Sequence, residues 1–181
     1  MNVVDTKIAD LLIIEPKVFS DDRGFFMENY SHKLFSEALG GVQEFVQDNH
    51  SRSKKNVLRG LHYQIKQPQG KLVQVIQGCI YDVAVDVRRS SPTFGHWVGI
   101  ELSGDNHRQL WIPSGFAHGF LVLSEQADII YKTTDYYAPE YERCIRWDDA
   151  DIGINWPHNE NLVLSIKDAE GESFQNAEVF K

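Results

Sequence analysis

The sequence predicts a mainly β protein, an antiparallel sandwich or barrel with a few short helices on the outside. Two observations lead to this fold class. Short runs of alternating or apolar residues fill the middle of the chain and predict six strands, at 72–76, 79–87, 96–102, 109–112, 119–123 and 128–134. Turn-forming sequences such as Gln77-Gly78, Ser91-Pro92 and Pro113-Ser114-Gly115 separate these runs at short intervals, as is typical of antiparallel sheets.

Residues 79–87 carry the clearest strand pattern. Three valines share one face, and two aspartates with an alanine share the other: Val83, Val85, Val87 and Asp82, Ala84, Asp86. This period of two predicts a strand with one buried face.

The best helix candidate covers residues 31–39. Ser31 can cap it, Leu34, Phe35, Ala38 and Leu39 form one apolar stripe, and Gly40-Gly41 ends it. A weaker helix is expected near the C-terminus.

Composition and charge set limits on function. The 181 residues are 42% hydrophobic, enough for one domain over residues 1–181 without disulfides or structural zinc. The net charge of −8 repels phosphate backbones and anionic lipid, so neither nucleic acid nor a membrane is an expected partner.

Cys79 and Cys144 have no Cys or His at metal spacing and are expected to be reduced packing residues. The first residues lack signal-peptide features, and a cytoplasmic location is expected.

One segment departs from the acidic balance. Residues 49–81 contain six Lys or Arg and no Asp or Glu, which suits either a small anionic ligand or an ordinary solvated face. Within this segment, a turn at 66–70 predicts a hairpin that returns Lys71 toward His62. An imidazole can remove a proton next to a carbonyl and an ammonium can stabilise the resulting oxyanion, so the pair predicts enolisation chemistry. The alternative is a structural His and a surface Lys.

A second cluster contains Pro113-Ser114-Gly115-Phe116-Ala117-His118. This pattern resembles the second motif of the cupin barrels, although turn chemistry alone also explains the proline and the glycine. Metal-binding cupins resemble one another in a first motif with His-x-His, and here the comparable place is His62-Tyr63-Gln64. A neutral amide is a poor ligand for Fe, Mn or Zn, so no metal is expected.

Two further segments carry candidate functional side chains. Residues 19–28 set Arg23 in a glycine-containing turn flanked by aromatic residues, which suits a phosphate and a stacked base, or an ordinary hairpin with core phenylalanines. Tyr131 shares one strand face with Ile129 and Thr133. A buried tyrosine usually finds a hydrogen-bond partner, and a few act as acids.

Taken in order, these segments resemble the dTDP-4-dehydrorhamnose 3,5-epimerase family. The resemblance includes Phe-x-Asp-x-Arg-Gly-Phe-Phe at 19–26 and rests on nine strings, at 19–26, 45–51, 57–62, 70–73, 82–86, 91–95, 111–120, 131–132 and 167–169. It implies a cupin-type double-stranded β-helix (jelly-roll) barrel, a homodimer, and cofactor-free epimerisation of dTDP-4-dehydro-6-deoxy-D-glucose at C3 and C5, on the route to dTDP-L-rhamnose.

The resemblance also implies roles for individual residues. His62 would be the base with Asp168 as its dyad partner, Tyr131 the acid on the opposite face of the sugar, and Lys71 would lie near the C4 oxygen. The other positions would bind substrate, Arg59 and His118 at the sugar or phosphate and Arg23, Glu28, Gln47, Asn49, Phe19 and Phe26 at the nucleotide.

Elementary chemistry agrees with these roles, because C3 and C5 both adjoin the C4 ketone and neither inversion needs a redox cofactor. No Gly-x-Gly-x-x-Gly dinucleotide motif occurs in the chain. Three alternatives stay open: a monofunctional 3- or 5-epimerase of a related sugar, a metal-dependent cupin, and a non-catalytic nucleotide-sugar-binding module. Tyr63 stands where we expect the family to carry Phe, and on an alternating strand it should point away from His62.

Overall fold

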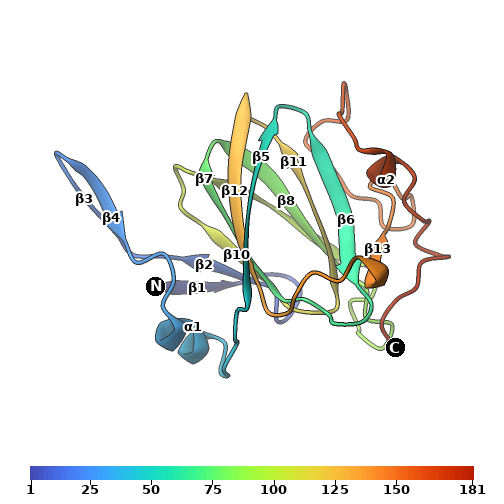
Figure 1. The fold of residues 1–181 in the computed structure, drawn as a ribbon, viewed down its shortest axis with the longest axis horizontal. Coiled ribbons are helices and arrows are strands. Elements are labelled where there is room, and N and C mark those ends of the chain that lie inside the picture. Colours follow the sequence, from blue (N-terminus) through green and yellow to red (C-terminus); the bar gives the residue numbers. More distant parts are fainter.

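The computed structural model describes residues 1–181 and contains two antiparallel sheets that face each other (Figure 1). In spatial order, the six-stranded sheet consists of β1 (Asn2–Asp5), β2 (Leu12–Glu15), β10 (Gln109–Ile112), β7 (Lys71–Gln77), β12 (Gln126–Thr133) and β5 (Gln47–Lys54). The five-stranded sheet consists of β13 (Glu142–Cys144), β6 (Leu58–Gln64), β11 (Phe116–Val122), β8 (Cys79–Asp86) and β9 (Trp97–Ser103). The predicted mainly β fold is confirmed, and the two sheets form the jelly-roll barrel.

Three apolar clusters hold the layers together. The largest fills the space between the sheets and includes Val73 of β7 and Ala84 of β8. A second covers the outer face of the five-stranded sheet with residues that follow β13. The third packs α1 (His32–Ala38) on the outer face of the six-stranded sheet, where the Phe35 and Trp111 rings meet edge to face.

Two short elements, η1 (Pro139–Tyr141) and α2 (Ile166–Ala169), lie beside the five-stranded sheet. No helix is long and apolar enough to span a bilayer.

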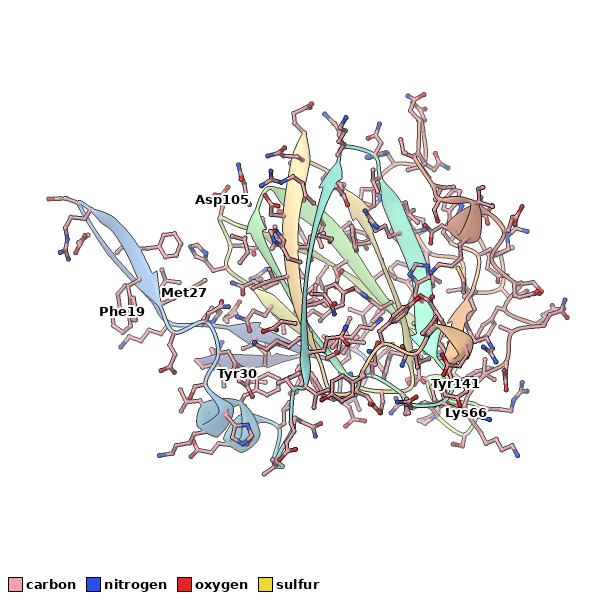
Figure 2. All side chains as sticks on the ribbon, in the orientation of Figure 1. Phe19, Met27, Tyr30, Lys66, Asp105 and Tyr141 are labelled. Atoms are coloured by element: carbon pink, nitrogen blue, oxygen red, sulfur yellow. The ribbon has the colours of Figure 1, made fainter.

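One element leaves the barrel altogether. The hairpin of β3 (Val18–Asp21) and β4 (Gly24–Met27) pairs only with itself and projects from the molecule (Figure 1). Figure 2 shows Phe19 on this hairpin, away from the two sheets. More than half of the surface of Phe19, Phe25 and Phe26 is exposed, so these rings are not core residues in the single chain.

Most elements expected from the sequence are present. The six predicted strands correspond to β7 through β12, and the predicted 31–39 helix is α1, with the Ser31 side chain accepting a hydrogen bond from Leu34 N. The helix expected near the C-terminus is α2.

Two expectations are wrong. Strand β8 is buried on both faces, with its valines toward the outer cluster and Ala84 toward the central core. Asp82 and Asp86 are fully buried; Asp86 accepts hydrogen bonds from polar partners, whereas Asp82 contacts His118 through Oδ1 and has no hydrogen-bond partner at Oδ2. Residues 58–77 are not a hairpin either, because β6 and β7 belong to different sheets and the chain between them crosses from one sheet to the other.

Candidate active site

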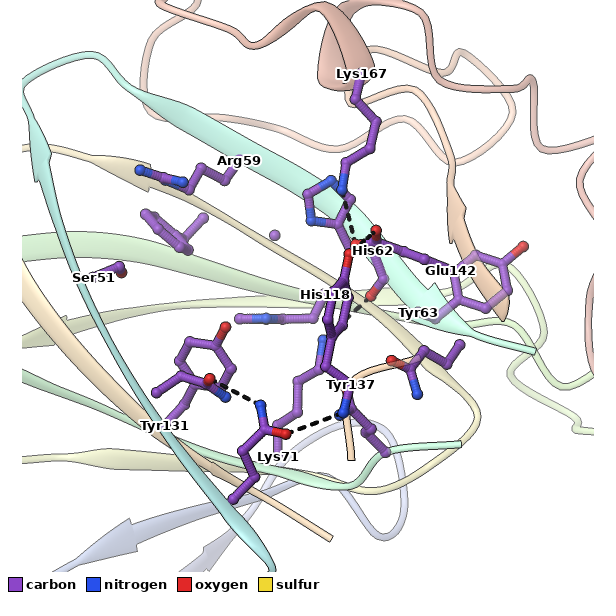
Figure 3. Close-up of a pocket in the computed structure, with 16 residues that line it drawn as sticks. Ser51, Arg59, His62, Tyr63, Lys71, His118, Tyr131, Tyr137, Glu142 and Lys167 are labelled. Carbon is purple, nitrogen blue, oxygen red and sulfur yellow. Dashed lines mark hydrogen bonds and ion pairs between the residues drawn. The ribbon is translucent and has the colours of Figure 1, made fainter. Parts of the chain in front are cut away.

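A cavity of about 350 Å³ opens between the two sheets (Figure 3). Strands of both sheets line it: β6, β11 and β13 from one side and β5, β7 and β12 from the other. The cavity brings together seven of the twelve residues predicted from the sequence: Gln47, Asn49, Arg59, His62, Lys71, His118 and Tyr131. An eighth, Asp168, is buried directly behind His62.

His62 and Asp168 form a close pair, with 2.6 Å between His62 Nε2 and Asp168 Oδ1. Burial lowers the pKa of His62, and Asp168 offsets this only in part, so the imidazole is neutral at pH 7. Burial acts to raise the pKa of Asp168, but contacts from His62, Ser165 and Gly60 outweigh it and hold that pKa well below its usual range. The result is a neutral imidazole backed by a carboxylate, with Nδ1 as the nitrogen that does not face Asp168.

Local sequence explains why Asp168 has this position. Ser165 caps α2, since its Oγ accepts a hydrogen bond from Asp168 N at 3.1 Å and donates one to Asp168 Oδ2 at 2.6 Å. Gly60 N donates to Asp168 Oδ1 at 3.1 Å. Gly60 has a φ of +122°, and a Cβ there would collide with Gly119 of β11, so only glycine permits this approach of β6 to β11.

Lys71 begins β7 and is half-buried in the cavity wall. Its Nζ donates to the carbonyl oxygen of His62 at 3.5 Å. Burial lowers the pKa of Lys71 to about 8, although Glu142 and Asp82 act to raise it. The expected proximity of Lys71 and His62 is therefore confirmed, but the crossing between sheets produces it rather than a hairpin.

Tyr131 lies on β12, in the sheet that faces the His62 strand. The two side chains line the cavity from opposite walls (Figure 3). Burial is the main cause that raises the pKa of Tyr131, so its phenol keeps its proton at neutral pH. A base and a neutral acid therefore face one another across a space that a small molecule can enter.

The two residues at the cupin-like positions, His118 and Gln64, contact other groups of the protein. His118 Nε2 lies 2.8 Å from Asp82 Oδ1, and both side chains are buried. The Gln64 amide donates to Gln67 O at 2.8 Å and accepts from Ala138 N at 2.9 Å, so it ties two loops together. The side chains of His62, Gln64 and His118 therefore each contact another protein group. The three side chains are not arranged around one shared metal ion.

Three of the cavity residues that sequence reasoning missed are linked to one another: Tyr137, Glu142 and Lys167. Glu142 Oε1 pairs with Lys167 Nζ at 2.8 Å, and Glu142 Oε2 accepts from the Tyr137 hydroxyl at 2.9 Å. Burial acts to raise the pKa of Glu142, but the bonds from Lys167 and Tyr137 outweigh it and leave that pKa lowered. No pattern marks Glu142, whereas Lys167 directly precedes the predicted Asp168 and could have been flagged by that proximity.

The open end of the cavity is polar. Gln47 Nε2 donates to Asn49 Oδ1 at 3.0 Å, and Gln47 Oε1 accepts from Tyr137 N at 3.1 Å. Arg59 is exposed, and its Nε donates to Ser53 Oγ at 3.1 Å. These groups offer hydrogen-bond donors and a positive charge to a ligand that extends out of the cavity.

The other four predicted residues lie elsewhere. Phe19, Arg23, Phe26 and Glu28 belong to the projecting hairpin or its base, and none of them lines the cavity. Arg23 pairs with Asp21 at 2.6 Å and has 90% of its side chain exposed. Phe19, Phe26 and Glu28 instead line a separate hollow of about 300 Å³ at the base of the hairpin.

Tyr63 is on the other face of β6, as expected. Its ring packs against Phe180, and its hydroxyl donates to the carbonyl oxygen of Glu178. The extra hydroxyl relative to Phe therefore has a backbone acceptor outside the His62–Tyr131 space.

Comparison with known proteins agrees with this architecture. Residues 5–176 match the family described as dTDP-4-dehydrorhamnose 3,5-epimerase. The chain is 57% identical over 180 residues to the dTDP-4-dehydrorhamnose 3,5-epimerase of Pseudomonas aeruginosa, with 99% of each chain covered. The structure of a dTDP-6-deoxy-D-glucose-3,5-epimerase from Legionella pneumophila in complex with dTDP-4-keto-L-rhamnose superposes with a TM-score of 0.96 at 55% identity, covering 98% of this chain and 94% of that one.

A more distant structure, a 3'-monoepimerase from Streptomyces bikiniensis in complex with dTDP-quinovose, has a TM-score of 0.89 at 32% identity and covers 94% of this chain and 86% of that one. The fold is therefore common to proteins named as 3,5-epimerases and to one named as a 3'-monoepimerase. By the match along nearly its whole length, the chain belongs to the dTDP-4-dehydrorhamnose 3,5-epimerase family.

Proposed function

We propose that this protein epimerises dTDP-4-dehydro-6-deoxy-D-glucose at C3 and C5 to give dTDP-4-dehydro-L-rhamnose, in the biosynthesis of dTDP-L-rhamnose. The observation that supports this most is the pair of His62 and Tyr131 on opposite walls of one cavity that also holds the Lys71 ammonium. Inversion of a carbon needs a base on one face and a proton donor on the other. Membership of the family supports the same reaction and the same substrate.

The proposed chemistry uses only side chains of the cavity. His62 Nδ1 takes the proton from C5 or C3, and Asp168 stabilises the imidazolium that forms. The electron pair of the broken C–H bond becomes an enolate with its charge on O4, beside Lys71. Tyr131 then gives its phenolic proton to the opposite face of the carbon, and proton exchange with water restores both residues.

Lys71 suits the oxyanion for a physical reason. Its ammonium is desolvated by the surrounding protein and makes one long hydrogen bond to a backbone carbonyl. A poorly solvated positive charge gains more from a nearby anion than a surface lysine does. With a pKa of about 8, the side chain still carries its proton at pH 7. No metal or redox cofactor enters this proposed chemistry.

We further propose that Arg59 and His118 contact the sugar or phosphates and that Gln47 and Asn49 contact the nucleotide. The cavity of about 350 Å³ is small for a complete nucleotide sugar, and its polar opening is the exit for the diphosphate. A cytoplasmic location stays a prediction.

We also propose a homodimer in which the hairpin of one chain completes the nucleotide site of the other. Phe19 and Phe26 are direct cross-strand neighbours on the hairpin, and 52% and 70% of their surfaces are exposed. Adjacent exposed rings with Arg23 at the turn match a thymine base next to a diphosphate. Because the hairpin projects from the two sheets of its own chain and none of its residues lines the cavity, these groups are available to a second copy.

The decisive experiment is isotope exchange. The protein is incubated with dTDP-4-dehydro-6-deoxyglucose in D₂O, and C3 and C5 are followed by NMR. Deuterium uptake with inversion at both carbons is the expected result. His62→Ala should abolish uptake at both carbons while still binding dTDP in calorimetry, which separates loss of the base from loss of the fold. A wild-type protein that binds dTDP without any exchange would instead be a non-catalytic binding module.

The same experiment distinguishes the second candidate, a monofunctional epimerase of a related sugar. The likeness to a 3'-monoepimerase is the specific observation in its favour. Uptake at one carbon alone would support it and rule out the two-carbon reaction. Loss of exchange on chelation, with metal present in the purified protein, would point to a metal-dependent cupin.

A further inference from the structure

Behind the His62–Asp168 pair, a third potential metal ligand completes a cluster. The Cys144 thiol of β13 lies near both side chains, and the ligand atoms of His62, Cys144 and Asp168 are all within 4.8 Å of one another. Three different elements supply them: β6, β13 and α2. Cys144 does not line the sugar cavity and instead lines a separate open hollow with Lys167 and Glu172.

Imidazole, thiolate and carboxylate are the ligand types that zinc prefers in proteins. A zinc ion with one thiolate, one carboxylate and one neutral imidazole is electrically neutral, which matters because burial of net charge is costly. Ligand atoms around tetrahedral zinc are about 3.3–3.7 Å apart, because each lies about 2.0–2.3 Å from the ion. The present spacing requires the His62–Asp168 contact of 2.6 Å to open by about 1 Å, and the sulfur lies within 4.8 Å of the other two ligand atoms.

We propose that His62, Cys144 and Asp168 form a site for a zinc-type divalent cation, and that occupation of this site inhibits the epimerase. The inhibitory part rests on the proposed function, whereas the binding part does not. The open hollow beside Cys144 gives the ion a route that avoids the sugar cavity, and a water from this hollow can supply the fourth ligand.

Inhibition follows from the identity of the coordinating nitrogen. The nitrogen that faces Asp168 is Nε2. When Nε2 binds the ion, the imidazole must carry its remaining proton on Nδ1, which is the nitrogen that takes the substrate proton in the proposed reaction. The thiol proton leaves to solvent as the sulfur–metal bond forms, and the ion also occupies the carboxylate oxygen that would stabilise the imidazolium. Binding of one ion therefore removes both the basic nitrogen of His62 and the stabilising carboxylate of Asp168.

The charges around the cluster limit which cations bind. Lys71 and Lys167 act on His62 as positive charges, and Glu142 is the nearby negative charge that pairs with Lys167. This arrangement disfavours hard cations such as Mg²⁺, which rely on charge and on several oxygen ligands. A soft ion that bonds to sulfur overcomes the repulsion, so the site should select zinc, cadmium or cobalt over magnesium.

Cobalt(II) tests binding independently of turnover, because a cobalt–thiolate bond produces a charge-transfer band in the near ultraviolet. Wild type and Cys79→Ser should show this band at a stoichiometry of one, whereas Cys144→Ser should not. Cys79→Ser is the matched control, because Cys79 lies on β8 and has no part in the cluster. Absence of the band in wild type, or its survival in Cys144→Ser, would overturn the site.

Zinc titration of the isotope exchange tests inhibition, with each variant compared with its own metal-free rate. Zinc should inhibit wild type and Cys79→Ser equally and magnesium should inhibit neither. Cys144→Ser should require at least about 10-fold more zinc, since even changes around a metal site cost about 10–100-fold in affinity. Equal zinc sensitivity of Cys144→Ser would refute the inhibitory role. If the protein exchanges no deuterium at all, the proposed function fails, and the cobalt band still decides the site.

Discussion

The sugar cavity and the projecting hairpin are built on opposite principles. In the cavity, two sheets bury the functional side chains, and only 23% of the His62 side chain is exposed. On the hairpin, 70% of Phe26 and 90% of the Arg23 side chain are exposed. The cavity therefore holds polar side chains in fixed positions within one chain, whereas the hairpin exposes the rings and the guanidinium that we propose bind the nucleotide of a second chain.

Under the proposed function, this difference separates the residues that catalyse proton transfer from the residues that bind the nucleotide. Proton transfer requires groups held within about 3 Å of the reacting atoms, and strands in a packed barrel provide that accuracy. Recognition of a base and a diphosphate tolerates groups on an isolated two-stranded hairpin, because stacking and charge attraction are less demanding in geometry. Changes in the cavity should therefore alter turnover, and changes on the hairpin should alter affinity.

The largest expected effect belongs to the cavity. Tyr131→Phe removes the proposed acid and leaves the base, so His62 can still remove a proton and return deuterium to the same face. We expect deuterium uptake to continue while formation of the L-sugar falls by about 10²–10⁴-fold, the usual contribution of a general acid. Quantitative NMR of uptake and of product in one sample measures both. If deuterium uptake and product formation fell equally, Tyr131 would also take part in proton removal, and its assignment as the proton donor alone would be contradicted.

A smaller effect is expected on the hairpin. Phe26→Ala should raise KM by roughly 5–150-fold with little change in kcat, because a stacked base contributes about 1–3 kcal/mol. Phe25→Ala is the matched control, since Phe25 lies on the same hairpin but packs against His107 of its own chain, with 4.6 Å between the ring centroids. Steady-state kinetics distinguishes the two variants.

Mixing variants tests whether the hairpin acts between chains. Phe26→Ala and His62→Ala homodimers are each defective, but a hybrid contains one site in which both residues are intact. With free exchange of subunits, about a quarter of wild-type activity should return at limiting substrate. No recovery after unfolding and refolding the mixture would contradict a site shared by two chains.

The sequence predicts the two regions unequally well. The strands β7 to β12 follow from their apolar patterns, whereas β5 carries polar residues on both faces as Gln47–Lys54 and gives no such signal. Lys71 near His62 was predicted from the wrong connection, because a six-residue link serves a hairpin and a crossing between sheets equally well. Glu142 could not be found, since its partner Lys167 is 25 residues away and only the packing of α2 against the barrel joins them. The position of the hairpin outside the barrel also has no local signature, because phenylalanine is usually a core residue.

The smallest expected effect concerns a buried aspartate that stabilises the barrel and lies in neither the cavity nor the hairpin. Asp86 ends β8, is fully buried, and accepts hydrogen bonds from Arg88, Ser91 and Thr93. Burial acts to raise its pKa, but these bonds outweigh it and lower the pKa to about 2. The unfolded carboxyl has a pKa near 3.8, so the folded state binds its proton less readily and gains about 2 kcal/mol above pH 4, which is lost as the pH falls through 2.

Asp86→Asn should therefore lower the free energy of unfolding by about 2 kcal/mol at pH 7, and the gap from wild type should shrink between pH 4 and pH 2. Urea unfolding across this range measures it, while KM and kcat at pH 7 should stay unchanged because Asp86 touches neither the cavity nor the hairpin. Asp148→Asn is the control, since Asp148 pairs with Arg146 at the surface and its loss should cost at most about 1 kcal/mol. If Asp86→Asn changed KM, the stability of the barrel and the binding of substrate at the hairpin would be coupled. The two regions would then not act independently.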